Sequence, residues 1–236
     1  MDTYNVTLNQ LAYGIFEVVR GQLSDDDDIA LKLIKDMVHS TRAMLLKQKF
    51  DKNIRTIDDV FTQPLGALEI EPVDSSAHST ILAGRYMYRT VRELPETIDR
   101  KNYEGTFTRI GPADKLAPPY HLVSYDRALF SGRGKFNRDS IFCFLRDRKM
   151  HLISFSGAYH KGVQFIDIQG VFENPAQVAI FMNTSGSALT FDDESYPISR
   201  TMKDSIEKII IREKLGPGAN APSDSINDGK HNLDAT

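Results

Sequence analysis

The sequence predicts an α+β protein, in which a helical bundle carries an inserted antiparallel β domain, sandwich-like or barrel-like, and an extended C-terminal arm. Three observations predict this fold. Apolar residues recur at helical spacing near both ends of the chain, seven short segments between them have strand character, and residues 216–236 are rich in Gly, Pro, Asn, Asp and Ser. We therefore assign residues 1–64 and 198–215 to the bundle, residues 65–197 to the β domain and residues 216–236 to the arm.

The first helix is expected from about Val6 to Arg20. Thr7 and Gln10 have the spacing of a capping box, in which each side chain binds a backbone amide of the first turn. Gly21 favours termination directly after this segment. The inner face is expected to hold Leu8, Leu11, Ala12, Ile15, Val18 and Val19.

A second helix is expected to begin at the acidic run of residues 24–28, Ser-Asp-Asp-Asp-Asp, and to end near Lys49. Carboxylates in a first turn are stabilised by unpaired amides and by the helix dipole, so capping explains the aspartates. Calcium loops interleave their ligands with glycine and end on a distant glutamate, and this run lacks that pattern. The inner face of the helix is expected to hold Ala30, Leu33, Ile34, Met37, Thr41, Met44 and Leu45.

The β domain is expected to follow Pro64 and Gly66, which break the helical pattern. Residues 147–149, Asp-Arg-Lys, have the composition of a hairpin turn, and Asn174 with Pro175 predicts the start of a short helix near residues 175–182. Strands are expected at residues 67–71, 85–91, 106–110, 120–125, 141–145, 150–155 and 162–171.

The last helix is expected from about Ser199 to Leu215. An exposed apolar stripe is unfavourable, so we expect this helix to pack against the first two. Residues 216–236 contain too few apolar side chains to fold alone, which predicts an arm that becomes ordered on contact with a partner. The inner face of the helix is expected to hold Met202, Ile206, Ile209, Ile210 and Leu215.

The composition is that of a globular protein. Apolar residues make up 41% and charged residues 26% of the 236 residues, and a chain of this length buries roughly 70% of its surface. The single cysteine, Cys143, excludes an internal disulfide and lies in an apolar run, so it is expected to be buried. The sequence has no signal-peptide pattern and no apolar run of about 18 residues, so we expect a soluble protein made in a reducing cytoplasm.

The net charge of −3 conceals an uneven distribution. Residues 81–170 carry 15 basic and 9 acidic side chains, a balance of +6, whereas the remainder has a balance of −9. A solvated surface, ion pairs between subunits and contact with DNA phosphates all remain possible explanations. No predicted helix in this segment has a basic stripe, so sequence-specific reading of DNA is not expected. Arg85 and Arg89 would share a strand face, with further basic side chains at Arg109, Arg127 and Arg133.

The motifs that commonly mark enzymes are incomplete here. Residues 131–135 read Ser-Gly-Arg-Gly-Lys, but Phe136 follows where a phosphate-binding loop needs Ser or Thr. The six histidines lack the spacing of a metal site, and residues 184–187 lack the strand and helix of a nucleophile elbow. Residues 192–194, Asp-Asp-Glu, could supply paired carboxylates, although a solvated acidic loop is favoured. We therefore expect no catalytic residue, no cofactor and no bound metal.

Seven blocks along the chain form an ordered pattern over some 220 residues. The blocks are LNQLAYGIFEVVRGQLSDDDDIAL at residues 8–31, FTRIGP at 107–112, YDRA at 125–128, SGRGKFN at 131–137, GVFENP at 170–175, YPI at 196–198 and NDG at 227–229. Each block alone is a capping or turn signal, but taken in this order they resemble the ring proteins of the head-to-tail connector of crAss-like phages.

The resemblance implies a virion structural protein without enzymatic activity. Such proteins form rings below the portal of a short-tailed phage and build the channel through which DNA is ejected. The implied partners are further copies of the chain, twelve by resemblance to portal-bound connectors, together with the portal and neighbouring ring or tail proteins. Genomic DNA would be passing cargo, and neither a membrane nor a small-molecule substrate is implied. The implied location is the virion, after assembly in the host cytoplasm.

A closed ring uses head-to-tail contacts, and regions of opposite charge suit such contacts. A channel for DNA must avoid gripping phosphates, so we expect an acidic or mixed lumen. The alternative function is a nucleic-acid-binding protein that uses a basic β-sheet face, and a third is an enzyme whose site only the fold assembles. Residues expected in subunit contacts are Arg85, Arg89, Arg127, Arg133, Asp224, Asn227 and Asp228.

Overall fold

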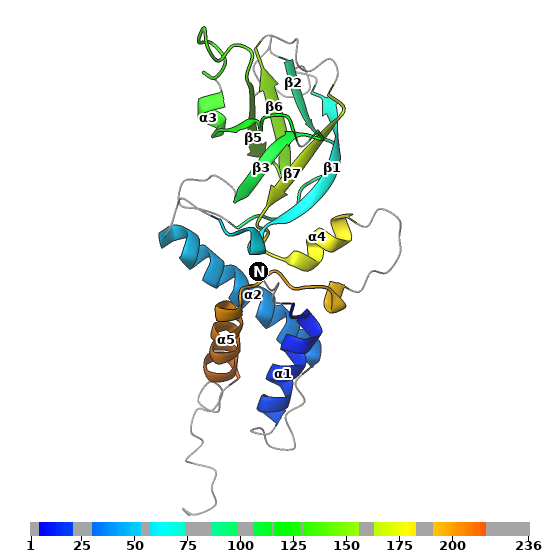
Figure 1. Cartoon of the computed structure of the whole chain (residues 1–236), viewed down its shortest axis with the longest axis vertical. Coiled ribbons are helices and arrows are strands. Elements are labelled where there is room, and N and C mark those ends of the chain that lie inside the picture. The colour runs from blue at the N-terminus through cyan, green and yellow to red at the C-terminus, as the bar shows by residue number, and fades with distance from the viewer. Residues whose placement is uncertain are drawn as a thin grey trace, which may run out of the picture.

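The computed structural model describes residues 5–20, 30–52, 57–73, 86–98, 106–114, 116–128, 130–155, 163–182 and 191–215. The described chain is elongated, with helices α1, α2 and α5 at one end and a curved β-sheet at the other (Figure 1). Helix α4 lies between these two ends, close to α2 in the view of Figure 1. This arrangement confirms the predicted α+β fold.

Three helices form the helical end: α1 (Leu8–Arg20), α2 (Leu31–Lys52) and α5 (Arg200–Ile209), which continues as a π-helical segment, η3 (Ile210–Lys214). Their apolar faces meet in one core, which confirms that the last helix packs against the first two. The fully buried members of this core include Leu11, Ile15, Ile34, Leu46, Phe61, Ile206 and Ile210.

The predicted capping box is present at the start of α1. The backbone amide of Thr7 donates to Oε1 of Gln10 at 3.2 Å, and the backbone amide of Gln10 donates to Oγ1 of Thr7 at 3.1 Å. The inner face is as predicted except for Val18, which is exposed. At α5, the side chain of Ser199 accepts a hydrogen bond from the amide of Met202 at 3.4 Å and caps that helix.

The predicted inner face of α2 is partly wrong, since Leu33 and Met44 are exposed. The helix packs against α1 and α5, and its side chains also bond to chain segments that leave the sheet, so its buried face is wider than an apolar stripe and includes polar residues. The aspartates expected to cap this helix lie outside the described residues. The buried residues are Ile34, Val38, His39, Thr41, Arg42, Ala43, Leu46 and Phe50.

The β-sheet has seven strands in the order β3-β7-β1-β2-β6-β5-β4. All neighbouring pairs are antiparallel except β4 and β5, so the sheet is mixed rather than purely antiparallel. The amide of Tyr120 donates to the carbonyl of Ile110 at 2.7 Å, which joins the two edges and nearly closes a barrel. The strands are β1 (Gln63–Pro72), β2 (Tyr86–Thr90), β3 (Phe107–Pro112), β4 (His121–Leu122), β5 (Ile141–Arg146), β6 (Lys149–Ser154) and β7 (Phe165–Gly170).

Each predicted strand has a counterpart in the sheet, but the strand at residues 120–125 is mostly wrong. β4 contains two residues, and a short helix, α3 (Tyr125–Ala128), follows it. The ring of Tyr125 packs edge-on against Phe144 at 5.4 Å, which places α3 on the outer face of β5. The glycine-rich loop therefore follows a helix, and only its far side leads into a strand.

The start of the sheet also differs from the prediction. Pro64 and Gly66 lie inside β1, where the pairing with β7 shifts register between Pro64 and Ala67. Gly66 has a φ of 72°, a conformation that glycine adopts without strain, so these residues form a β-bulge instead of preceding the strand.

The predicted turn and short helix are confirmed. Asp147 and Arg148 have φ values of 51° and 59°, and this pair of left-handed residues connects β5 to β6 in a two-residue hairpin. Helix α4 (Pro175–Met182) starts as predicted, since Oδ1 of Asn174 accepts a hydrogen bond from the amide of Ala176 at 2.9 Å. Two 3-10 helices, η1 (Asp59–Phe61) and η2 (Phe191–Asp193), complete the described elements.

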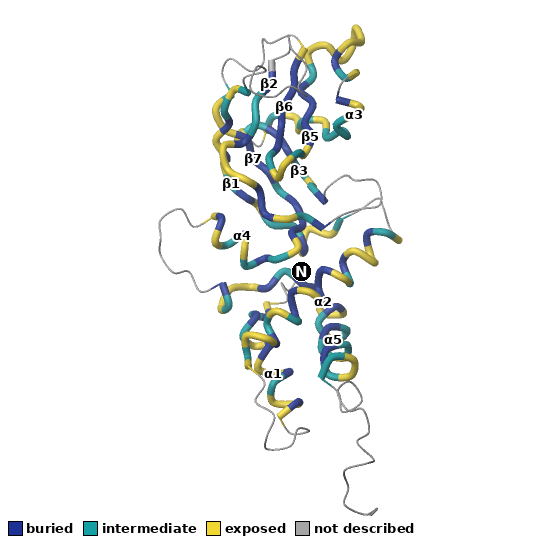
Figure 2. Tube along the Cα trace, turned by 180° about the vertical axis from the view of Figure 1, so that it is seen from behind, coloured by how far each residue is buried: buried dark blue, intermediate teal, exposed yellow. Residues whose placement is uncertain are grey.

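Buried residues follow the inside of the sheet and the facing sides of the helices (Figure 2). The barrel core contains Cys143, which is fully buried as predicted, and α4 adds Val178 and Phe181 to it. Among the helices that the structure describes, none is both long and apolar enough to cross a membrane. The domain boundaries expected from the sequence stay a prediction.

Candidate assembly interface

The helical end and the barrel are joined through the guanidinium of Arg42, on α2. This side chain is fully buried. Its Nε donates to the carbonyl of Pro197 at 3.0 Å, and its Nη1 donates to the carbonyl of Phe172 at 2.9 Å. Phe172 follows the last strand and Pro197 precedes α5, so this one side chain bonds both ends of the segment that leads from the barrel back to the helices. Burial lowers the pKa of Arg42 to about 10, and the group stays charged at neutral pH.

A second contact at this junction involves His39 and Tyr196. Nδ1 of His39 lies 2.8 Å from the hydroxyl of Tyr196. Burial, with a smaller contribution from the nearby charge of Arg42, lowers the pKa of His39 to about 4. Burial also raises the pKa of the Tyr196 hydroxyl. His39 is therefore a neutral, hydrogen-bonded residue of the interior, and the junction orients the two ends of the molecule.

The acidic segment at η2 is largely exposed, as favoured from the sequence, and two of its carboxylates also contact the helices. Oδ2 of Asp192 lies 2.6 Å from Nζ of Lys35, on α2. Oδ1 of Asp193 accepts a hydrogen bond from Nδ2 of Asn9, on α1, at 2.7 Å. Both carboxylates therefore stabilise the packing of the helical end, and the pair of catalytic carboxylates considered from the sequence is not supported.

Two of the basic side chains on the sheet lie beside carboxylates of the same chain. Nε of Arg89 is 2.6 Å from Oε1 of Glu71 on the neighbouring strand β1. Nε of Arg109 is 3.8 Å from Oδ2 of Asp167 on β7. Arg85, expected to share a face with Arg89, lies outside the described residues. The sheet therefore presents less free positive charge than the sequence suggests.

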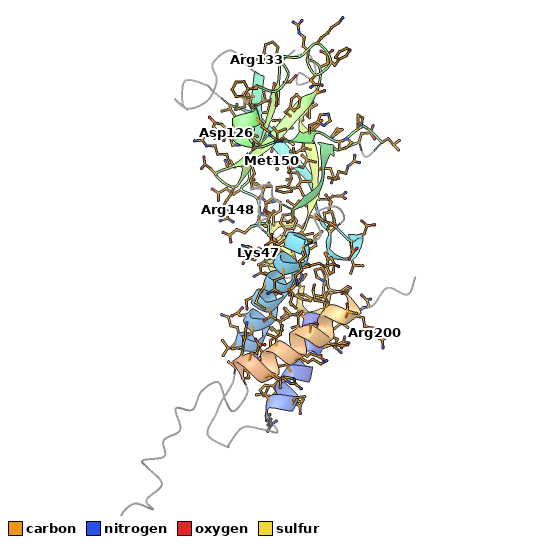
Figure 3. All side chains as sticks on the ribbon, turned by 90° about the vertical axis from the view of Figure 1, so that its left-hand side faces the viewer. Lys47, Asp126, Arg133, Arg148, Met150 and Arg200 are labelled. Carbon is orange, nitrogen blue, oxygen red and sulfur yellow. The ribbon has the colours of Figure 1, made fainter. Side chains whose placement is uncertain are left out.

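Arg127, on α3 at the flank of the barrel, and Arg133, in the glycine-rich loop, are both exposed. Figure 3 shows Arg133 at the distal end of the barrel, the end farthest from the helices, and far from Lys47 and Arg200. The carbonyl of Arg127 accepts hydrogen bonds from the amide of Ser131 at 3.0 Å and from its hydroxyl at 2.8 Å, which links α3 to the glycine-rich loop. The other expected contact residues, Asp224, Asn227 and Asp228, lie outside the described part of the chain.

The distal loop, residues 130–138, also presents aromatic residues that sequence reasoning missed. Phe130 is 72% exposed and Phe136 is 92% exposed. Both residues flank the Ser-Gly-Arg-Gly-Lys segment. A phenylalanine next to glycines and basic residues is the sequence signal that could have indicated an exposed contact site here. Exposed aromatic side chains in a polar surrounding are typical of contact sites between proteins.

A cavity of about 360 Å³ opens at the same end of the molecule, where the barrel is closed by the hydrogen bond between Tyr120 and Ile110. Its lining is mostly apolar, and sequence reasoning had no means to find it because the lining comes from four separate segments. The lining residues include Pro112, Pro118, Pro119, Tyr120, Asp139, Ile141 and Val163.

A catalytic or metal centre is not among the described features. Within residues 5–215, excluding the gaps given above, no group of three or more His, Cys, Asp and Glu side chains could hold a metal ion. The thiol of Cys143 lies inside the barrel, where burial raises its pKa.

Comparisons with known proteins agree with the resemblance found in the sequence. The family model described as phage tail ring protein 2 matches residues 10–233. A curated relative, Ring protein 2 of Bacteroides phage crAss001, is 22% identical over 237 aligned residues, which cover 97% of this chain and 98% of the relative. The match includes both the helical end and the barrel, and the chain belongs to the phage tail ring protein 2 family of crAss-like phages, a family of virion structural proteins.

Proposed function

We propose that the protein forms one ring of the head-to-tail connector below the portal of a short-tailed phage. The observation that carries this proposal is the extent of the family match, which spans residues 10–233 and thus both ends of the subunit. In this function twelve copies close into a ring, and DNA leaves the capsid through its centre. The portal and neighbouring ring or tail proteins are the other partners, and assembly takes place in the host cytoplasm.

The shape of the subunit supports a ring. A closed cyclic assembly needs two unlike faces that bind each other, and an elongated subunit with a junction bonded by Arg42 presents such faces in a constant orientation. Two of the predicted contact residues that the structure describes, Arg127 and Arg133, are exposed and available for ion pairs with a neighbour. The arm at residues 216–236 would add contact area on assembly.

The charges on the sheet support a channel that does not bind DNA tightly. Each phosphate neutralised by a basic side chain adds salt-dependent affinity, which would slow the passage of DNA. Arg89 and Arg109 lie beside Glu71 and Asp167, so these arginines are partly neutralised within the subunit. This pairing favours the ring over the alternative of a nucleic-acid-binding protein, and the lumen is expected to be acidic or mixed.

Cryo-electron microscopy of the virion vertex, focused on the collar below the portal, tests this function. The expected result is a ring whose density fits a helical end and a seven-stranded barrel, with the copy number read directly from its symmetry. A collar without density for this fold would overturn the proposal. A lumen lined by Arg89 and Arg109 would overturn the part that concerns DNA passage.

A further inference from the structure

The distal loop, residues 130–138, carries one apolar side chain that is almost completely exposed. Phe136 is 92% exposed, although burial of a phenylalanine side chain stabilises a protein by about 2 kcal/mol. Exposed basic side chains surround it: Arg133, Lys135 and Arg138. Within the part of the chain that the structure describes, these three side chains form no ion pair. An aromatic group among unpaired basic groups fits a partner that is apolar with an acidic rim.

The base of this loop is held in place while its tip projects. Gly132 has a φ of 80°, and a Cβ added there would lie 3.1 Å from Cβ of Phe155 and 3.8 Å from the ring of Phe142. The base is therefore packed against the outer face of the sheet. Beyond it, the amide of Asn137 donates to the carbonyl of Gly134 at 3.2 Å, which closes a turn at the tip. Phe136 therefore lies within a hydrogen-bonded turn and is exposed to solvent.

The distal cavity has the properties that such a side chain requires. Its volume of about 360 Å³ lies in the range of small-molecule sites and accommodates one phenyl ring. Proline, tyrosine, isoleucine and valine residues supply most of the lining, which also includes His121, Asp139 and Ser140. The cavity thus combines a largely apolar lining with one acidic residue, which is complementary to Phe136 and its basic neighbours.

The distal loop does not fill the cavity of its own chain. Phe136 is 92% exposed, so its ring lies outside the cavity, although Asp139, three residues further along, belongs to the cavity lining. The base of the loop is packed against Phe142 and Phe155 through Gly132. A neighbouring copy is therefore better placed than the same chain to supply the phenyl ring.

We propose that Phe136 of one subunit inserts into the distal cavity of the next subunit in the ring. Arg133 and Lys135 then lie near the carboxylate of Asp139 on that neighbour. The contact uses a different face on each copy, so it repeats head to tail and closes a ring, as cyclic symmetry requires. This inference rests on the proposed ring function and assigns one of its subunit contacts.

Disulfide cross-linking in assembled virions tests the contact. Asn137→Cys lies next to Phe136 and leaves that side chain intact, and Ala117→Cys lines the cavity with little change of volume. The natural thiol of Cys143 is fully buried, so it contributes little background. After mild oxidation of virions that carry both substitutions, the expected result is a ladder of dimers, trimers and larger species on a non-reducing gel. Virions with either substitution alone should yield monomers.

Any other cross-linking result would refute the contact between Phe136 and the cavity of the next subunit, and each result would indicate a different alternative. An internal disulfide without cross-linked species would show that the loop fills the cavity of its own chain. Dimers alone would show a two-fold pairing. A ring visible in micrographs of the same virions, but without cross-links, would refute this contact while the ring function stands. Virions without a ring of this protein would refute both.

Phe136→Ala provides a second test that does not depend on cross-linking. The variant should reduce the number of virions with a complete collar at least tenfold and leave the melting temperature of the purified protein unchanged. Ile180→Ala is the matched control, because Ile180 on α4 is 73% exposed and lies at the opposite side of the barrel from the distal loop. Normal assembly of the Phe136→Ala variant would refute the proposal.

Discussion

The hydroxyl of Tyr196 lies 2.8 Å from Nδ1 of His39, across a sequence separation of 157 residues. The contact joins α2 to the segment that precedes α5, beside the guanidinium of Arg42. It buries two titratable groups in neutral form at the point where the barrel meets the helices. The stability of the subunit should therefore depend on pH and on the polar contacts of this junction.

We expect His39 to make the protein less stable in acid. The pKa of His39 is about 4 in the folded protein and 6.5 in the unfolded chain, so between these values only the unfolded chain binds the proton. The free energy of unfolding should decrease by about 3 kcal/mol as the pH falls through this window. His39→Gln should remove this part of the decrease, measured by urea unfolding at several pH values. The pKa of His151 is also lowered, so the His39→Gln variant should keep the part of the acid destabilisation that comes from His151. Equal pH profiles for both proteins would contradict the prediction.

Replacing Arg42 should weaken the junction. Arg42→Met fills a similar volume but leaves the buried carbonyls of Phe172 and Pro197 without donors, which costs about 1–3 kcal/mol for each group. Removal of a buried charge offsets part of this cost, so we expect a net loss of about 3 kcal/mol in urea unfolding. Lys47→Met, at an exposed position of the same helix, should change stability by less than about 0.5 kcal/mol. An Arg42→Met protein as stable as the wild type would show that the junction is maintained by apolar packing alone.

The hairpin between β5 and β6 can be improved. Asp147 and Arg148 both have positive φ values, where asparagine and glycine are preferred. The double variant Asp147→Asn/Arg148→Gly should raise the free energy of unfolding by about 1 kcal/mol, since the lost contacts of Arg148 are long, at 3.4 Å and 3.9 Å. Asp147→Val should have the opposite effect, because a β-branched residue is strained at this φ. A destabilised double variant, in thermal unfolding experiments, would mean that the Arg148 contacts outweigh the backbone preference.

The isolated protein should not bind DNA at physiological salt. Arg89 and Arg109 lie beside carboxylates, so few basic groups on the sheet are free to displace counterions from phosphates. We expect elution from immobilised duplex DNA below about 0.15 M salt, where charges are screened within about 8 Å. Retention at higher salt, reduced by Arg127→Glu or Arg133→Glu, would favour the nucleic-acid-binding alternative instead.

Deletion of residues 216–236 should leave a folded subunit that does not assemble stably. All members of the described cores precede residue 216, so the melting temperature should not change. Collar formation should be lost, because the contact area of the arm is missing. Virions with normal collars in the presence of the truncated chain would refute the role of the arm.

Features with local causes could be predicted from the sequence. The capping box of Thr7 and Gln10, the start of α4 at Asn174 and the turn at Asp147 each depend on residues within four positions of one another. Alternation of side chains located all seven strands, with the largest error at β4. β4 is short, and its pairing with the parallel strand β5 stabilises it. The alternation of apolar and polar side chains in its own sequence does not.

Sequence patterns could not predict which polar residues of α2 are buried or which apolar residues of the distal loop are exposed. The partners of Arg42 and His39 lie 130 to 157 residues away, and helical periodicity carries no information about them. In the same way, Arg89 became an intramolecular partner of Glu71 through strand pairing, and Phe136 became exposed because Gly132 packs on the outer face of the sheet. Local free energies of caps and turns can be read from neighbouring residues, whereas burial depends on which distant segments the fold brings together.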